Sequence, residues 1–235
     1  MKNKKHFKLI LILVAILLSY INYQKGINEN LSKGETNTSY QIENVPEYEG
    51  NDYVIINNNE PLFSESEITT DSYELYGKLD YLGRATSTFA NIGPDSMPTK
   101  ERESIGMIKP SGWRTVKYDI VSGKYLYNRC HLIGYQLTGE NANINNLITC
   151  TIQMNTGAML DFENQVANYI RETKNHVLYR AIPIYEDDNL LAKGVNIQAL
   201  SIEDHGKGIK FNVFIYNVQK GIKINYKTGE SSLIE

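Results

Sequence analysis

The chain has 235 residues, enough for one domain of moderate size with short extensions. A hydrophobic fraction of 41% is ordinary for a globular protein, and 17 tyrosines favour a strand-rich fold. The formal net charge of −3 excludes a strongly basic protein, so a polyanionic ligand would need a local basic groove.

Residues 1–25 have the features of an export signal, because four lysines precede the apolar run Leu9–Leu18. The run is shorter than the ~20 residues that span a bilayer, and no small-x-small cleavage site follows. A cleaved signal peptide and a retained membrane anchor therefore both stay open. Either one makes the rest of the chain extracellular or surface-attached. Without the five lysines of residues 1–25 the formal net charge changes from −3 to −8.

Residues 26–43 are polar and lack apolar periodicity, so we interpret them as a flexible linker. No internal repeat and no second boundary follow. We therefore expect a single domain over residues 44–235.

The pattern of this domain predicts many short strands and one principal helix. Two apolar segments cover 73–84 and 85–91, and residues 96–112 are loop-like. The helix is expected from about Gly157, with apolar residues at helical spacing, and the strand at 176–185 is expected to break at Pro183. Strands are expected at 52–57, 113–120, 128–133, 147–152, 176–185, 190–201 and 209–218. The predicted fold class is α+β, with an antiparallel sheet.

Reactive side chains gather in residues 128–163, which we interpret as strand, turn-rich loop, strand and helix. His131 lies on the first strand, and Arg129 shares its face by the two-residue period of a strand. Asn155 and Glu163 flank the start and the second turn of the helix. A neutral imidazole at near-neutral pH is suited to taking a proton from water.

The two cysteines, Cys130 and Cys150, fall on the two expected strands of this stretch. Neighbouring residues of a strand point to opposite faces, so the adjacency of Cys130 and His131 does not make a catalytic dyad. The Cys and His spacings of a zinc site are absent. A cross-strand disulfide and two free thiols both stay open.

The motif Asn128–His131 (NRCH), the second strand, Asn155 and Glu163 resemble the DNA/RNA non-specific endonucleases of the ββα-metal (His-Me finger) class. The likeness runs from about residue 44 to the C-terminus and is strongest to exported and surface-anchored bacterial DNases. The family motif is Asp-Arg-Gly-His, so this chain has Asn128 for the acid and Cys130 for the glycine. The arginine and the histidine are retained. The resemblance implies an antiparallel sheet with a ββα finger as its catalytic core.

The resemblance also implies roles for five residues. His131 would be the general base, and Asn155 would bind a divalent ion directly, with Mg²⁺ expected and Mn²⁺ or Ca²⁺ as alternatives. Glu163 would hold waters of that ion. Arg129 would steady the substrate phosphate, and Arg180 is a weaker candidate for the same task.

The spacing of Asn155 and Glu163 adds a geometrical condition. Eight residues of regular helix extend about 12 Å. Both residues can therefore serve one ion only if Asn155 lies at or before the helix start, or if waters bridge the gap. Gly157 makes an irregular helix start plausible.

The function implied is an exported, metal-dependent endonuclease that hydrolyses DNA, with RNA as a second candidate substrate, and with little sequence preference. Membrane contact is expected only through the N-terminal segment, and no obligate protein partner is inferred. The alternative is a non-catalytic surface module that binds nucleic acid or a host partner and retains a relic motif. Turnover distinguishes the two, because a binding module shifts DNA on a gel without shortening it.

Overall fold

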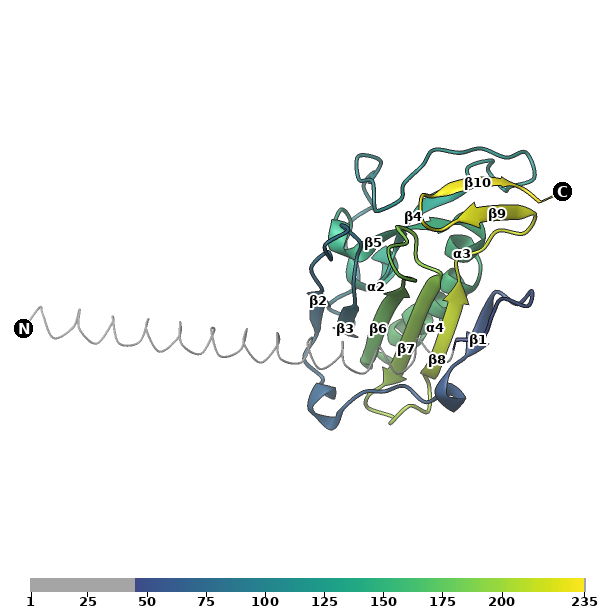
Figure 1. Ribbon diagram of the computed structural model, residues 1–235. Coiled ribbons are helices and arrows are strands. Elements are labelled where there is room, and N and C mark those ends of the chain that lie inside the picture. The colour runs from purple at the N-terminus through teal and green to yellow at the C-terminus, as the bar shows by residue number, and fades with distance from the viewer. Residues whose placement is uncertain (1–44, 235) are drawn as a thin grey trace, which may run out of the picture. The chain divides into compact units, whose positions relative to one another are not determined.

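The computed structural model describes residues 45–234, which belong to the unit Asn44–Glu235 (Figure 1). The predictions made for residues 1–25 and 26–43 lie outside the described residues. Among residues 45–234, no helix combines the length and the apolar character needed to cross a bilayer.

The centre of the domain is a six-stranded antiparallel sheet in the order β1-β8-β7-β6-β3-β2 (Figure 1). Its longest strands, β6, β7 and β8, lie side by side and are buried along nearly their whole length. The strands of this sheet are β1 (Tyr53–Ile55), β2 (Tyr73–Tyr76), β3 (Thr88–Ile92), β6 (Val177–Ile184), β7 (Gly194–Ser201) and β8 (Lys210–Tyr216).

Two antiparallel hairpins complete the strands. β4 (Tyr127–His131) pairs with β5 (Leu147–Thr151), and β9 (Ile222–Asn225) pairs with β10 (Glu230–Leu233). Between β4 and β5 the chain forms a short helix α2 (Tyr135–Thr138) and a 3-10 helix η3 (Ile144–Asn146). Two further 3-10 helices lie near the start of the domain, η1 (Asn57–Asn59) and η2 (Glu65–Glu67).

The principal helix is α4 (Ala158–Thr173), preceded by the short helix α3 (Ile152–Thr156). Its buried side chains recur at spacings of three and four residues, which places them on one stripe of the helix. They are Ala158, Met159, Phe162, Glu163, Val166, Ala167 and Ile170. The helix ends at Lys174, which takes a left-handed conformation (φ 64°) and donates its N–H to the Ile170 carbonyl at 2.9 Å.

The main core lies between one face of the sheet and this helical stripe. Alternate residues of β6, such as Val177, Tyr179 and Ala181, pack there with α4 and with buried residues of β4 and β5. The intervening residues of β6 face the other side, where smaller apolar clusters contain residues from 45–76. The sheet is therefore covered on both faces, and the β4–β5 hairpin lies on the α4 side.

The structure confirms the α+β class and most expected strands, with shifts of a few residues at their ends. The strand expected at 113–120 is wrong, because only Lys117 makes a bridge, to Tyr125. Alternation alone does not make a strand without a partner. The break expected at Pro183 is also wrong. β6 continues to Ile184, and beyond Ala181 it pairs only with β7, so the proline lies where β3 no longer pairs with it.

Candidate active site

His131 is the last residue of β4 and is 6% exposed. Its Nε2 lies 2.8 Å from the Asn141 carbonyl oxygen, so Nε2–H donates and the lone pair is on Nδ1. Nδ1 accepts from Arg102 Nη2 at 3.3 Å. Burial lowers the pKa of His131 to about 4, and the Arg102 charge acts in the same direction, although the Asn141 hydrogen bond opposes them. The imidazole is therefore neutral at pH 7.

The loop that orients His131 is held at both of its ends. Asn146 is fully buried and bonds the backbone of Ile133 twice, accepting from its N–H at 2.9 Å and donating to its carbonyl at 3.0 Å. The side chain of Asn141 donates to the Glu103 carbonyl at 3.2 Å. These bonds fix the carbonyl that selects the tautomer of His131.

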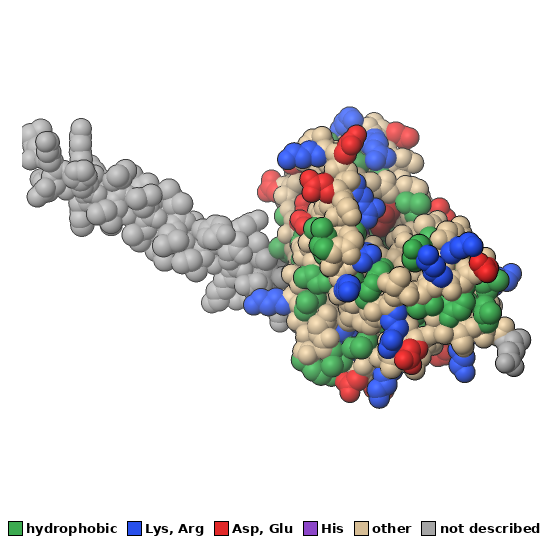
Figure 2. All heavy atoms as spheres, turned by 90° about the horizontal axis from the view of Figure 1, so that it is seen from above, with side chains coloured by type: hydrophobic (Ala, Val, Ile, Leu, Met, Phe, Trp, Pro, Cys, Tyr) green, Lys and Arg blue, Asp and Glu red, His purple; other side chains and the backbone are tan. Residues whose placement is uncertain are grey.

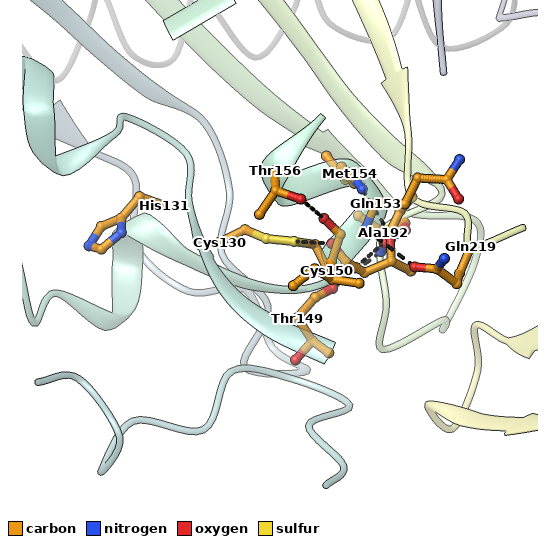
Figure 3. The surroundings of a disulfide bond; sticks show 12 residues. Cys130, His131, Thr149, Cys150, Gln153, Met154, Thr156, Ala192 and Gln219 are labelled. Atoms are coloured by element: carbon orange, nitrogen blue, oxygen red, sulfur yellow. Dashed lines mark hydrogen bonds between the residues drawn. A yellow bond between two sulfur atoms is a disulfide. The ribbon is translucent and has the colours of Figure 1, made fainter. Parts of the chain in front are cut away.

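A disulfide joins Cys130 and Cys150 across β4 and β5, with both residues fully buried in the main core. Strand alternation points the side chains of Cys130 and His131 to opposite faces, and Figure 3 shows the imidazole directed away from the sulfur atoms. The two cysteines are therefore structural and are not available as nucleophiles.

Asn155 lies in α3, before the start of the principal helix. Gly157 separates the two helices with φ −100° and ψ −121°, a conformation outside the helical region. A Cβ at this glycine would overlap the Gln153 carbonyl. The side-chain cap of α3 is Thr151, which accepts from Met154 N, so Asn155 does not cap the helix. Its position before the principal helix meets the condition that the spacing to Glu163 imposes.

Glu163 projects from α4 and is 9% exposed. Its carboxyl group lies against Gly134, where an added Cβ would overlap Oε2. Burial raises the pKa of Glu163 to about 8, although the Gln136 amide and the Arg102 charge oppose this shift. A buried carboxyl group is thus brought next to the loop that follows His131.

Arg129 lines a hollow that Asn155 also lines. Its guanidinium lies over the Trp113 ring, 3.9 Å from the centroid. It donates through Nε to the Ile108 carbonyl and through Nη2 to the Gly106 carbonyl at 2.6 Å. Arg129 therefore holds the loop at 106–113 against β4.

Arg180 is not brought to this site, and we withdraw it as a phosphate ligand. The side chain lies on the face of the sheet opposite to α4, is 5% exposed, and donates to Glu67 Oε1 at 2.5 Å and to the Leu62 carbonyl at 2.8 Å. The rings of Phe63 and Phe89 pack against its guanidinium. Its charge is neutralised within the fold.

Arg102 is a site residue that the sequence analysis missed. It lies in the loop between β3 and β4, contacts His131 Nδ1, affects the pKa of Glu163 and lines the hollow beside Asn155. The loop at 96–112 has no periodicity, and Arg102 lies 29 positions from His131 in the sequence. No local signal in the sequence could have found it.

An antiparallel strand pair followed by a helix, with a histidine at the end of the first strand, defines the ββα-metal class of nuclease folds. The family model for DNA/RNA non-specific endonucleases matches residues 64–202, and the chain belongs to this family.

The relatives agree with this assignment. A deoxyribonuclease from Streptococcus dysgalactiae subsp. equisimilis is 35% identical over 112 residues, which cover 45% of this chain and 32% of that protein. The chain thus spans about a third of this relative's length. The fold is similar to NucA from Streptococcus agalactiae with magnesium bound (TM-score 0.72, 22% identity, 85% of this chain and 96% of that one). It is also similar to Sda1 nuclease with zinc bound (TM-score 0.63, 24% identity, 80% and 98%).

Proposed function

We propose that the chain is an exported, metal-dependent endonuclease that hydrolyses phosphodiester bonds of DNA, with RNA as a second candidate substrate and with little sequence preference. The observation that carries this proposal is the buried, neutral His131, whose Nδ1 lone pair is oriented by the Asn141 carbonyl. Membership of the endonuclease family supports the reaction class.

His131 is the general base of this proposal. With Arg102 turned from Nδ1 to the substrate phosphate, Nδ1 takes a proton from the water that attacks phosphorus. The ester bond from phosphorus to the leaving oxygen breaks, and that oxygen takes a proton from solvent water. The Nε2–H bond to Asn141 keeps the ring oriented during the transfer. Because the pKa of His131 is lowered to about 4, the base is in its active form at neutral pH. Low basicity slows proton transfer, so the attacking water must itself be activated.

Asn155 and Glu163 have the chemistry of a site for a hydrated divalent ion. The Asn155 amide oxygen is a ligand that suits Mg²⁺, Mn²⁺ or Ca²⁺, and within residues 45–234 its side chain makes no hydrogen bond. The carboxyl group of Glu163 would accept hydrogen bonds from the waters of the ion. When bound, the ion would lower the pKa of water and offset negative charge on the phosphate. NucA was solved with magnesium and Sda1 with zinc, which supports a divalent ion without deciding its identity.

The substrate phosphate is assigned to Arg102 and Arg129. Within the described part of the chain neither side chain is in an ion pair, so both charges remain available to an anion. Arg129 uses Nε and Nη2 for the loop, which leaves Nη1 for the phosphate. Contacts to the phosphate backbone of a nucleic acid carry no information about its base sequence.

Export is proposed from the lysine-rich, apolar start of the chain, which lies outside the described residues. Extracellular or cell-surface localisation would give the enzyme access to free nucleic acid. Fractionation of the producing cell tests it: the chain should be found outside the cytoplasm, in the medium or with the membrane.

Plasmid digestion tests the activity. The full chain should cut with Mg²⁺, should not cut with EDTA, and should lose several orders of magnitude of rate in His131→Ala. His205→Ala, in the turn between β7 and β8, is the matched control and should cut normally. A chain that shifts plasmid on a gel but never cuts with Mg²⁺, Mn²⁺ or Ca²⁺ would instead be the non-catalytic binding module.

A further inference from the structure

A hollow of about 470 Å³ opens beside Asn155, on the side of β4 that carries Arg129. Its volume is in the range of small-molecule sites, roughly 300–1,000 Å³. We call it the arginine–aromatic pocket and define it by Arg102, Trp113, Arg114, Tyr125, Arg129 and Asn155.

The pocket is basic although the protein is acidic. Three arginines line it, and no aspartate or glutamate is among the described residues of its wall. Arg114 is paired at 3.3 Å with Glu230, an exposed contact, whereas Arg102 and Arg129 have only uncharged hydrogen-bond partners. Figure 2, which views the molecule from above relative to Figure 1, shows basic, acidic and hydrophobic side chains intermixed on the face that it draws. The pocket therefore matches an anion locally, without a continuous basic surface.

Asn128 is a further uncharged residue in the wall of this basic pocket. It also lines the pocket, and its buried Nδ2 has no hydrogen-bond partner among the described residues. Asparagine at this position leaves a hydrogen-bond donor where an aspartate would add a negative charge.

The outer wall of the pocket is aromatic. Tyr125 lines the pocket and is 47% exposed, and the Lys117 ammonium lies over one face of its ring, 4.5 Å from the centroid. The backbone on either side of Tyr125 is paired, because Tyr118 N–H donates to the Lys124 carbonyl and Leu126 N–H donates to the Val116 carbonyl. An exposed ring beside arginines is the combination on which nucleobases stack without regard to sequence.

We propose that the arginine–aromatic pocket binds one unpaired nucleotide next to the scissile phosphate, with its base on Tyr125 and its phosphate near Arg102 and Arg129. This inference rests on the proposed function. A base within a duplex is stacked and paired, and it enters such a pocket only after unstacking and unpairing. The pocket therefore favours single-stranded over double-stranded substrate.

Fluorescence anisotropy with a labelled single-stranded 12-mer, and with the duplex of the same sequence, tests the proposal. The full chain is used with Mg²⁺ in the His131→Ala background, so that binding is measured without turnover. Tyr125→Ala should weaken single-strand binding by roughly fivefold or more, as expected for loss of base stacking. Duplex binding should change less than twofold, and Tyr125→Phe should retain the single-strand affinity because it keeps the ring.

Tyr81→Ala is the matched control, because Tyr81 is 81% exposed and does not line the pocket. Equal losses on the two substrates, or no loss in Tyr125→Ala, would overturn the subsite. A parallel digestion by the chain with His131 intact separates the two proposals. If it cuts neither substrate, the proposed activity fails, while the anisotropy comparison still decides whether the pocket binds an unpaired nucleotide.

Discussion

Opening the Cys130–Cys150 disulfide should destabilise the domain by about 3 kcal/mol. The bridge joins residues 20 positions apart, and closing a loop of that length removes about 3 kcal/mol of chain entropy from the unfolded state at 25 °C. The closed loop contains both His131 and the Asn141 carbonyl that orients it, so its loosening should also lower activity. Reduction is the cleaner perturbation, because alanine substitution would also remove two sulfur atoms from a fully packed core.

Urea unfolding of the full chain, with and without a phosphine reductant, measures this effect. Trp113 is the only tryptophan, so its fluorescence can follow the transition. With a slope of about 1–3 kcal/mol per molar urea, the midpoint should fall by roughly 1–3 M on reduction. The Cys130→Ala/Cys150→Ala variant is the control, and the reductant should not change its midpoint. The reasoning is refuted if thiol titration counts two free thiols in the reduced protein and the midpoint has not moved.

Three further changes test the site. Protonation of His131 should stop cutting as the pH falls toward about 4. The pKa of His131 in the unfolded chain is near 6.5, so the unfolded state binds more protons than the folded state between pH 6.5 and pH 4. About 3 kcal/mol of the stability present above pH 6.5 should therefore be lost by pH 4. The His131→Gln variant should not show this loss in pH-dependent unfolding. Gly134→Ala should lower kcat roughly tenfold or more with little change in Tm, because the new methyl group displaces the Glu163 carboxyl group. Unchanged turnover in this variant would remove Glu163 from the mechanism. Arg180→Ala should lower the free energy of unfolding by roughly 3–5 kcal/mol, because it leaves Glu67 buried and unpaired. Activity per folded molecule should stay at the wild-type level, and a selective rise in KM would return Arg180 to the site.

Local pattern in the sequence predicted much of the catalytic finger. The two-residue period placed Arg129 and His131 on one face and Cys130 on the other. The spacing from Asn155 to Glu163 allowed one shared ion if Asn155 lay at or before the helix start, or if waters bridged the gap, and Asn155 does lie before α4. These features depend on neighbouring residues of one strand or one helix. Backbone geometry alone therefore determines them.

Pairing partners were harder to predict, because a strand depends on what lies beside it. Residues 113–120 alternate like a strand but meet only one bridge partner, whereas β9 and β10 were missed although they pair over four residues each. The disulfide stayed undecided for the same reason. Two cysteines on adjacent strands can be bridged only in a register that the sequence does not state.

The sequence by itself determined the endonuclease family and the elements that carry the candidate residues: a histidine on a strand, an asparagine near a helix start and a glutamate in the second turn of that helix. The tertiary structure alone decided which arginines surround them. It placed Arg180 in a buried ion pair on the far face of the sheet and brought Arg102 from a patternless loop to His131. Arginine has a long side chain and no preferred neighbour in sequence, so its partners are fixed only when the sheet, the helix and the loops have packed together.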